Sequence, residues 1–505
     1  MKLKTTAAAL LAAGLLAGCN FAPTYQRPDA PVPGTLNQQA GAADAQAAAT
    51  AADWQPLAWQ QWVQDESLRQ LIALALEGNR DLRVAVANME RARAQYGVQR
   101  ADLLPTVAAS AQGNRSRTAD DLTTAGRANT TGQYSVQLGL ASYELDLWGR
   151  VRNLSEAALQ QYLQTEESRR VVQLGLVTDV ANAWLALAAD QQRLQLARDT
   201  LAAREHSYQL AQRMQALGAT NGLVLAQNQT TLEAARGDVA NYETQVARDR
   251  NALQLLLGAP VPAQYLPAPP QPSFSVQALQ SGGLKGDALP GLQPVAALTG
   301  STALTPVPGD LPSSVLLARP DVAAAERSLQ ASYASIGAAR AAFFPTISLT
   351  ANVGTASSQL DGLFGSGNGT WSFIPQLRLP IFDAGRNQAN LGVANANRDA
   401  TLAQYEKSIQ TAFREVNDAL ADRATLQRRL QAQAGQVDAA GKVLSLSQAR
   451  FRAGADDFLT VLDAQRSLYT AQQTQITLLQ SEQVNRIALY KALGGGWGQE
   501  GTQKE

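Results

Sequence analysis

The chain has 505 residues, with 42 basic and 42 acidic side chains and a formal net charge of zero. That length is enough for two or more ordinary domains, and the charge balance provides no basic surface of the kind that nucleic-acid binding needs. The single His206 and single Cys19 exclude most zinc sites and most thiol or imidazole catalytic sites, which bring several such groups together. Catalysis would have to rest on carboxylates, and the pair Glu166 and Glu167 lies in a long charged segment typical of a solvated helix surface. We therefore expect no metal site, no nucleic-acid partner and no enzyme.

Residues 1–18 have the three parts of a secretory signal peptide: a basic start, an apolar middle and small residues before Cys19. The residues ending at Cys19 resemble a bacterial lipobox, in which the Cys is acylated; the alternative is an ordinary signal peptide with an incidental Cys. An unpaired thiol is a liability in an oxidising compartment, which favours acylation. An Asp directly after the acylated Cys would resemble the signal that retains such lipoproteins in the inner membrane. This chain has Asn20 at that position, so we expect an outer-membrane lipoprotein. Residues 19–65 are predicted to form an extended segment that begins at the acylated Cys19. We expect no transmembrane helix in the chain.

A first repeat is predicted at residues 66–259, in the order helix, two strands, long helix, hairpin tip and return helix. Its first helix should run from 66 to 103, before a proline. Alternation of apolar and polar residues then predicts strands at about 106–114 and 133–146. The long helix contains no proline, and at 1.5 Å per residue it would be about 100 Å long. Such a length is typical of a coiled-coil rod. The tip is expected near Gly218.

The same order of elements recurs in a second repeat at residues 314–494, with its tip near Gly454, 236 residues beyond Gly218 (454 − 218). Its strands are predicted at about 346–354 and 370–380. A duplicated unit of this kind indicates internal pseudo-symmetry. Two segments lie outside the repeats: a Pro- and Gly-rich connector at 260–313 and a Gly-rich tail at 495–505.

The predicted strands are apolar on one side and polar on the other, as in a membrane barrel with lipid outside and water inside. Four strands cannot close a barrel, and open sheet edges are not tolerated in hydrocarbon. Two copies would supply eight strands and three copies twelve, and periodicity does not choose between them. A soluble α+β lipoprotein without a pore is the alternative interpretation of the same pattern.

Four segments resemble the outer-membrane efflux lipoproteins of the TolC superfamily, OprM/NodT type. They are Pro23–Pro28, Leu311–Asp321 with its Arg-Pro-Asp ending, Phe382–Arg386, and the second tip, Arg450–Leu468. The resemblance implies a mainly α-helical chain of two tandem helix-strand-strand-helix repeats. Three copies would form a 12-stranded outer-membrane β-barrel, continued by a long periplasmic α-helical barrel.

The resemblance also implies a function. Such trimers work with a periplasmic membrane-fusion adaptor and an inner-membrane transporter of the resistance-nodulation-division class, and they export drugs or other small toxic compounds through the outer-membrane lipid. An exit duct for type I polypeptide secretion and a structural lipoprotein without a pore remain alternatives. No cofactor is implied beyond covalent lipid, N-acyl and S-diacylglycerol groups, on Cys19.

By the same resemblance, the periplasmic gate falls at the second tip. Leu459 and Asp463 match the family's apolar and acidic rings, and Leu223 and Gln227 occupy the corresponding places in the first tip. Leu459 and Asp463 are four residues apart and therefore lie on one helix face. Without the resemblance, Leu459 would be interpreted as a coiled-coil core position and Asp463 as a solvated charge.

The adaptor is expected to contact both tips, at Gly218, Gly454, Asp456 and Asp457. The two aspartates could instead cap the return helix, and the sequence leaves both roles open. Some family members lock this tip with a Tyr and an Arg, but this chain has Phe451 and Asp456. Because Phe451 donates no hydrogen bond, we expect that lock to be absent or different.

Overall fold

The structure is a computed structural model that describes residues 20–36, 57–122, 130–270, 303–306 and 311–496. The predicted signal peptide, Cys19, most of the connector and nearly all of the tail lie outside the described residues. The chain forms two compact units, and each unit contains parts of both sequence repeats. Unit 1 contains residues 1–30, 86–168 and 323–408; unit 2 contains residues 31–85, 169–322 and 409–505.

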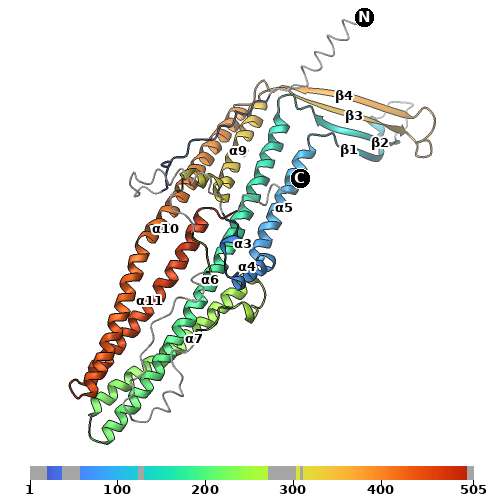
Figure 1. The fold of residues 1–505 in the computed structure, drawn as a ribbon. Coiled ribbons are helices and arrows are strands. Elements are labelled where there is room, and N and C mark those ends of the chain that lie inside the picture. Colours follow the sequence, from blue (N-terminus) through green and yellow to red (C-terminus); the bar gives the residue numbers. More distant parts are fainter. Residues whose placement is uncertain (1–19, 37–56, 123–129, 271–302, 307–310, 497–505) are drawn as a thin grey trace. The chain divides into compact units, whose positions relative to one another are not determined.

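Unit 1 contains a four-stranded antiparallel sheet whose strands lie in chain order, β1-β2-β3-β4 (Figure 1). The strands are β1 (Val107–Arg117), β2 (Thr130–Glu144), β3 (Thr346–Ser357) and β4 (Gly369–Arg378). The first pair is longer at the turn than the alternation predicts, because main-chain pairing continues through polar residues as far as Arg117 and Thr130. Apolar alternation detects only the part of a strand that has an apolar face.

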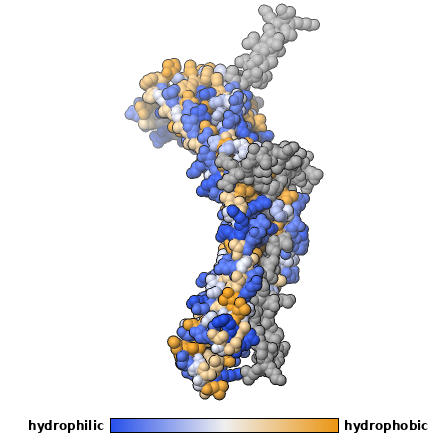
Figure 2. All heavy atoms as spheres, turned by 60° about the vertical axis from the view of Figure 1, so that its left-hand side comes forward, coloured by the Kyte–Doolittle hydropathy of each residue, from blue (hydrophilic) through white to orange (hydrophobic). Residues whose placement is uncertain are grey.

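The register puts apolar residues of neighbouring strands side by side on one face of the sheet. Leu138 pairs with Val353, and Val353 pairs with Trp371, whose side chain is 78% exposed. Gln137, Gly354 and Thr370 form the equivalent row on the other face. Figure 2 shows hydrophobic residues on much of the surface over the strands. A sheet that exposes its apolar face needs a cover that this chain does not supply among its described residues.

The extended segment that follows Cys19 is attached to α9 (Pro320–Ala341) in unit 1. The Phe21 ring stacks on Phe344 just beyond this helix, with ring centroids 4.5 Å apart. Glu326 of α9 accepts hydrogen bonds from the Tyr25 hydroxyl and from two nitrogens of Arg27. Aromatic stacking and a forked ion pair therefore hold this segment, although it has almost no regular secondary structure.

The predicted helix from 66 to 103 is wrong in one respect, because it is divided into α4 (Glu66–Gly78) and α5 (Arg80–Ala101). Asn79 lies between them in an extended conformation. Its side-chain oxygen accepts from the main-chain N–H of Leu82, and its amide donates to the Leu256 carbonyl oxygen. One side chain thus caps the start of α5 and satisfies a carbonyl at the end of another helix.

Two helical hairpins make up most of unit 2. The first joins α6 (Arg150–Ala216) to α7 (Gly222–Leu257), and the second joins α10 (Arg386–Arg452) to α11 (Phe458–Ala492). The predicted extended segment, 19–65, includes a helical turn, α3 (Trp59–Trp62), where Trp62 is buried and stacks on Tyr490 with ring centroids 3.9 Å apart. The described residues also contain three short 3₁₀ helices: η3 (Asp120–Leu122), η4 (Ala263–Tyr265) and η5 (Ser313–Ala318).

Helix α6 is long and apolar enough over one 18-residue window to cross a membrane, but 56% of that window is buried in the fold. Trp184 and Leu185 are almost fully buried, and the indole N–H of Trp184 donates to the Tyr265 carbonyl oxygen at 3.1 Å. These contacts are typical of a core helix, and they account for the hydropathy of the segment without a membrane.

Candidate gate at the hairpin tips

Both hairpins reverse through the same backbone motif. Gly218 and Gly454 have φ angles of 73° and 71°, in the left-handed region that favours glycine. At each tip the glycine N–H donates to the carbonyl three residues earlier, and the next N–H donates to the carbonyl five residues before it. These are the two bonds of a Schellman helix end. The two glycines are therefore required by the turn itself.

A side-chain cap starts the return helix at each tip. In the first tip the side chain of Asn221 accepts from the N–H of Val224 at 3.1 Å. In the second, Asp457 Oδ1 accepts from the N–H of Thr460 at 3.1 Å and from the Thr460 hydroxyl at 2.8 Å. Asp457 therefore caps the return helix, one of the two roles that the sequence leaves open for it, and its contact with the adaptor stays a prediction.

Asp456 has a different role, because it pairs with Arg450 across the turn. Arg450 Nε lies 2.6 Å from Asp456 Oδ2, and its Nη2 lies 2.8 Å from Oδ1. The guanidinium holds the pKa of the Asp456 carboxyl below its usual range. Beside this pair, Phe451 packs edge-on against Phe458, with centroids 5.0 Å apart. The second tip is thus held by an internal ion pair and an aromatic contact, without a tyrosine hydroxyl.

Leu459 and Asp463 lie one turn apart on the exposed face of α11. Leu459 is 42% exposed, whereas its neighbours Phe458 and Leu462 belong to a buried apolar cluster between α10 and α11. A coiled-coil core position would be buried, so Leu459 is available for contacts outside its own hairpin. Asp463 pairs with Arg466 at 2.9 Å, and both side chains are largely exposed. Sequence reasoning missed Arg466, although its spacing of three residues from Asp463 is a detectable signal.

The corresponding positions in the first tip lie one turn apart on α7. Leu223 is 66% exposed and Gln227 is partly buried. Figure 1 shows the two tips at the same end of unit 2. The four sequence-predicted positions therefore offer two exposed leucines, one amide and one carboxylate.

The face of α11 that carries Asp463 continues as a stripe of exposed threonines, Thr470, Thr474 and Thr477. Each hydroxyl donates to the carbonyl oxygen four residues earlier. A hydroxyl bonded in this way has no hydrogen left to donate to a passing solute. Thr477 also accepts a hydrogen bond from Arg193 of α6 at 3.2 Å, so a cation borders the stripe. The sequence analysis did not identify this stripe, although the recurrence of Thr at three and four residues would have indicated it.

A buried acid pair joins α6 to α7 in the same unit. Asp190 is buried and pairs with Arg193, which also donates to Gln480 of α11 at 2.9 Å. Asp249 of α7 lies against Asp190, and burial together with that carboxylate raises the pKa of Asp249 to about 6. Gln245 donates to Asp249 at 3.0 Å and partly offsets this rise. Among the residues with described positions, no group of three or more His, Cys, Asp or Glu side chains could hold a metal ion.

Comparison with known proteins gives consistent matches. The family model described as outer membrane efflux protein matches residues 71–259 and 311–495. The chain is 44% identical to the probable efflux pump outer membrane protein TtgC of Pseudomonas putida, over 96% of this chain and 94% of that protein. It is 42% identical to the outer membrane protein OprJ of Pseudomonas aeruginosa, over 97% and 95%. Its fold matches the open state of the MtrE outer membrane channel of Neisseria gonorrhoeae, with a TM-score of 0.78 and 36% identity over 95% of this chain and 98% of that one.

Proposed function

The chain belongs to the outer membrane efflux protein family and is an outer-membrane efflux channel; from that premise we propose that three copies form a passive, gated exit duct for drugs or other small toxic compounds. A periplasmic adaptor and an inner-membrane transporter of the resistance-nodulation-division class deliver the compounds. The observation that carries the proposal is the pairing of an uncovered four-stranded sheet with two long helical hairpins in one chain.

The sheet supports assembly from several copies. Among the described strands, β1 and β4 each have a partner on one side only, and an open edge is not tolerated in hydrocarbon. Strands of neighbouring copies would pair at these edges, and three copies would close a barrel of 12 strands. The exposed row that contains Leu138, Val353 and Trp371 would then face lipid, while the row that contains Gln137 and Thr370 would face water.

The second tip supports a gate. Three Leu459 side chains that meet on the channel axis would exclude water, and three Asp463 carboxylates one turn away would attract cations and repel one another. Leu223 and Gln227 would complete the constriction from the first tip.

Acylation of Cys19 would add a second attachment to the membrane. The contacts of Phe21, Tyr25 and Arg27 support this proposal, because they hold the chain against α9 from two residues after Cys19. Labelled palmitate should enter the wild-type protein and should not enter Cys19→Ser. Equal incorporation in both proteins would exclude Cys19 as the acylated residue.

Deletion of the gene tests the export function. With the cognate pump expressed, the deletion should increase susceptibility to several chemically unrelated toxic compounds, and a plasmid copy of the gene should restore resistance. Unchanged susceptibility to all of them would overturn the proposed function.

A further inference from the structure

We propose that the cavity between the two hairpin tips is a binding site for an uncharged, single-ring aromatic molecule. The site does not depend on which compounds the channel exports. It follows from the volume, the lining and the position of a cavity that neither hairpin fills.

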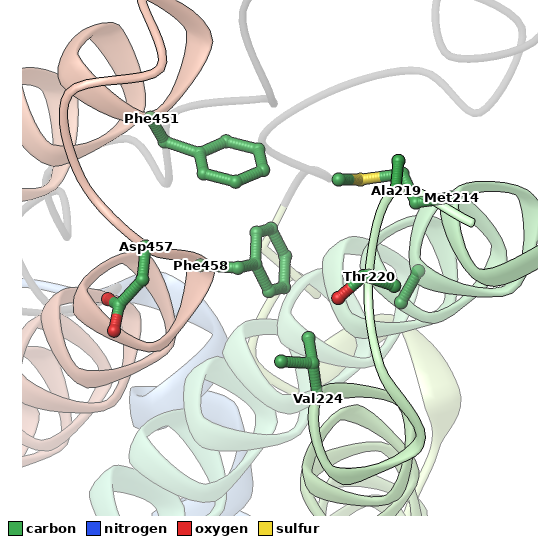
Figure 3. A pocket seen from close by; sticks show the side chains of 8 residues that line it. Met214, Ala219, Thr220, Val224, Phe451, Asp457 and Phe458 are labelled. Atoms are coloured by element: carbon green, nitrogen blue, oxygen red, sulfur yellow. The ribbon is translucent and has the colours of Figure 1, made fainter. Parts of the chain in front are cut away.

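The cavity has a volume of about 190 Å³ and is lined by residues of both tips. Figure 3 shows the rings of Phe451 and Phe458, from the second hairpin, facing Met214 and Val224 of the first. Protein interiors leave few voids larger than a water molecule. A dry apolar cavity of about 150 Å³ is known to bind benzene or xenon. The volume between the tips is therefore large enough for one aromatic ring.

The lining favours an aromatic occupant over an aliphatic one. Two phenyl groups can meet a third ring edge-to-face, an arrangement that adds to the gain from burial alone. The thioether of Met214 is flexible and makes favourable contacts with ring edges. These three side chains contribute most of the apolar surface that the ligand would contact.

The charge distribution favours a neutral ligand. Asp457 borders the cavity, but its Oδ1 is bonded to the N–H and hydroxyl of Thr460. In Figure 3 the Asp457 carboxylate points away from the space between the rings. Among the described residues that line the cavity, the one other polar side chain is that of Thr220, a neutral hydroxyl. A charged ligand would lose part of its hydration here, and the one charged group among the described residues that border the cavity, the Asp457 carboxylate, points away from it.

Because the cavity lies between the two tips, a ligand bound in it would affect how the tips are arranged. A bound ring would contact both hairpins at once, and it would touch Phe458, the residue directly before Leu459. A ligand shifts a conformational equilibrium by its difference in affinity for the two states. A ring that needs both walls would therefore favour the arrangement in which the two tips lie together.

Methionine NMR tests the site directly, because the chain contains only three methionines, Met1, Met89 and Met214. The purified full-length channel, labelled with ¹³C at the methionine methyl groups, would be titrated with benzene, and Met214→Leu would assign the signal. We expect the Met214 signal to shift and the shift to saturate, because the ring current of the benzene acts on this methyl group only at the bound position. The Met89 signal, from α5, should stay in place. A Met214 signal that does not move, or that drifts without saturation together with Met89, would overturn the proposal.

Two comparisons make the test specific. Val224→Phe fills the cavity from α7 and should abolish the response, whereas Leu217→Phe adds the same ring at an exposed position outside the cavity and should retain it. A saturable response that persists in Val224→Phe would contradict the assignment to this cavity.

Discussion

At the scale of single residues, each hairpin tip depends on one glycine in the left-handed region and on one side chain that caps the return helix. Gly218 and Gly454 follow from the need to reverse a long helix, and a helix cap was one of two roles foreseen for Asp457. The ion pair between Arg450 and Asp456 was not foreseen, since the sequence does not show which side of the turn each side chain occupies. The gate assignment of Leu459 and Asp463 rests on resemblance and on their exposure, and it remains a prediction.

The first residue-scale prediction concerns ion selectivity at the gate. Asp463→Asn leaves Arg466 unpaired and should lower the preference of the conducting channel for cations, whereas Arg466→Gln should raise it. The double variant is the matched control, because it removes both charges and should lie between the two. Reversal potentials in planar bilayers under a KCl gradient give the permeability ratios. Identical ratios in all variants would place Asp463 away from the conduction path.

The second residue-scale prediction concerns the stiffness of the tip. Asp456→Asn breaks the forked ion pair with Arg450, so amide hydrogen exchange at residues 450–458 should become faster. The effect should be modest, because exposed ion pairs contribute little. Asp457→Asn is the control, since Asn caps a helix about as well as Asp, and its exchange should match wild type. If Asp456→Asn also exchanged at the wild-type rate, the ion pair would have no role in ordering the tip.

At the scale of helices and strands, the periodicity of the sequence predicts most elements. It does not predict where an element is interrupted or extended by contacts with residues far away in the chain. The interruption at Asn79 depends on the Leu256 carbonyl, 177 residues away in the chain. The first strand pair extends beyond its apolar alternation because pairing of the main chain is enough to continue it. In both cases a contact between elements overrides the local pattern, and one sequence does not specify such contacts.

The acid pair between α6 and α7 gives a pH prediction. The pKa of Asp249 is raised to about 6, above its ordinary value of 3.8, so the native state binds more protons than the unfolded state between these values. The stabilising contribution is therefore fully present below pH 3.8 and is lost as the pH rises through about 6. Asn does not ionise, so Asp249→Asn should not lose stability in this way. The stability of the variant relative to wild type should therefore increase as the pH rises from 3.8 through about 6. Thermal unfolding midpoints between pH 4 and 7 measure the difference.

Asp179→Asn is the matched control for that measurement, because Asp179 is exposed on α6. It removes the same chemical group without touching Asp190 or Arg193, and its difference from wild type should not follow the trend of Asp249→Asn. A difference between Asp249→Asn and wild type that stays constant with pH would show that the acid pair does not hold a proton.

The second element-scale prediction concerns Arg319, which lies in the segment that ends Arg-Pro-Asp. Its side chain is 7% exposed and binds the carboxylates of Asp321 and Glu415, and it also donates to the Ala492 carbonyl oxygen. Arg319→Met should cost about 1–3 kcal/mol, the usual penalty for unsatisfied buried groups. We expect less than for a fully buried pair, since both carboxylates are about 40% exposed.

Unfolding of the purified channel measures this loss of stability, and two further variants serve as comparisons. Arg319→Lys should rescue only part of the stability, because a single ammonium does not reproduce the fork of the guanidinium. Arg198→Met removes an exposed ion pair with Glu243 and should change stability by less than about 0.5 kcal/mol. Equal effects of Arg319→Met and Arg198→Met on stability would show that the buried contacts of Arg319 contribute no more than an exposed ion pair.

At the scale of the whole molecule, the sequence predicted the duplicated order of elements, and the family matches fall on the two repeats, at 71–259 and 311–495. It did not predict that each compact unit would combine parts of both repeats. The number of copies does not follow from periodicity, because one chain supplies only four strands and the rest of a barrel belongs to other copies.

Single-channel recording in planar bilayers tests the gated duct most directly. We predict low conductance for the wild-type channel and a clearly higher conductance for Leu459→Ala, because the smaller side chain opens the apolar ring. Leu255→Ala, at an exposed leucine of α7, is the matched control and should behave as wild type. Absence of any conductance in all three proteins would contradict a pore, and equal conductance in wild type and Leu459→Ala would contradict a gate at Leu459.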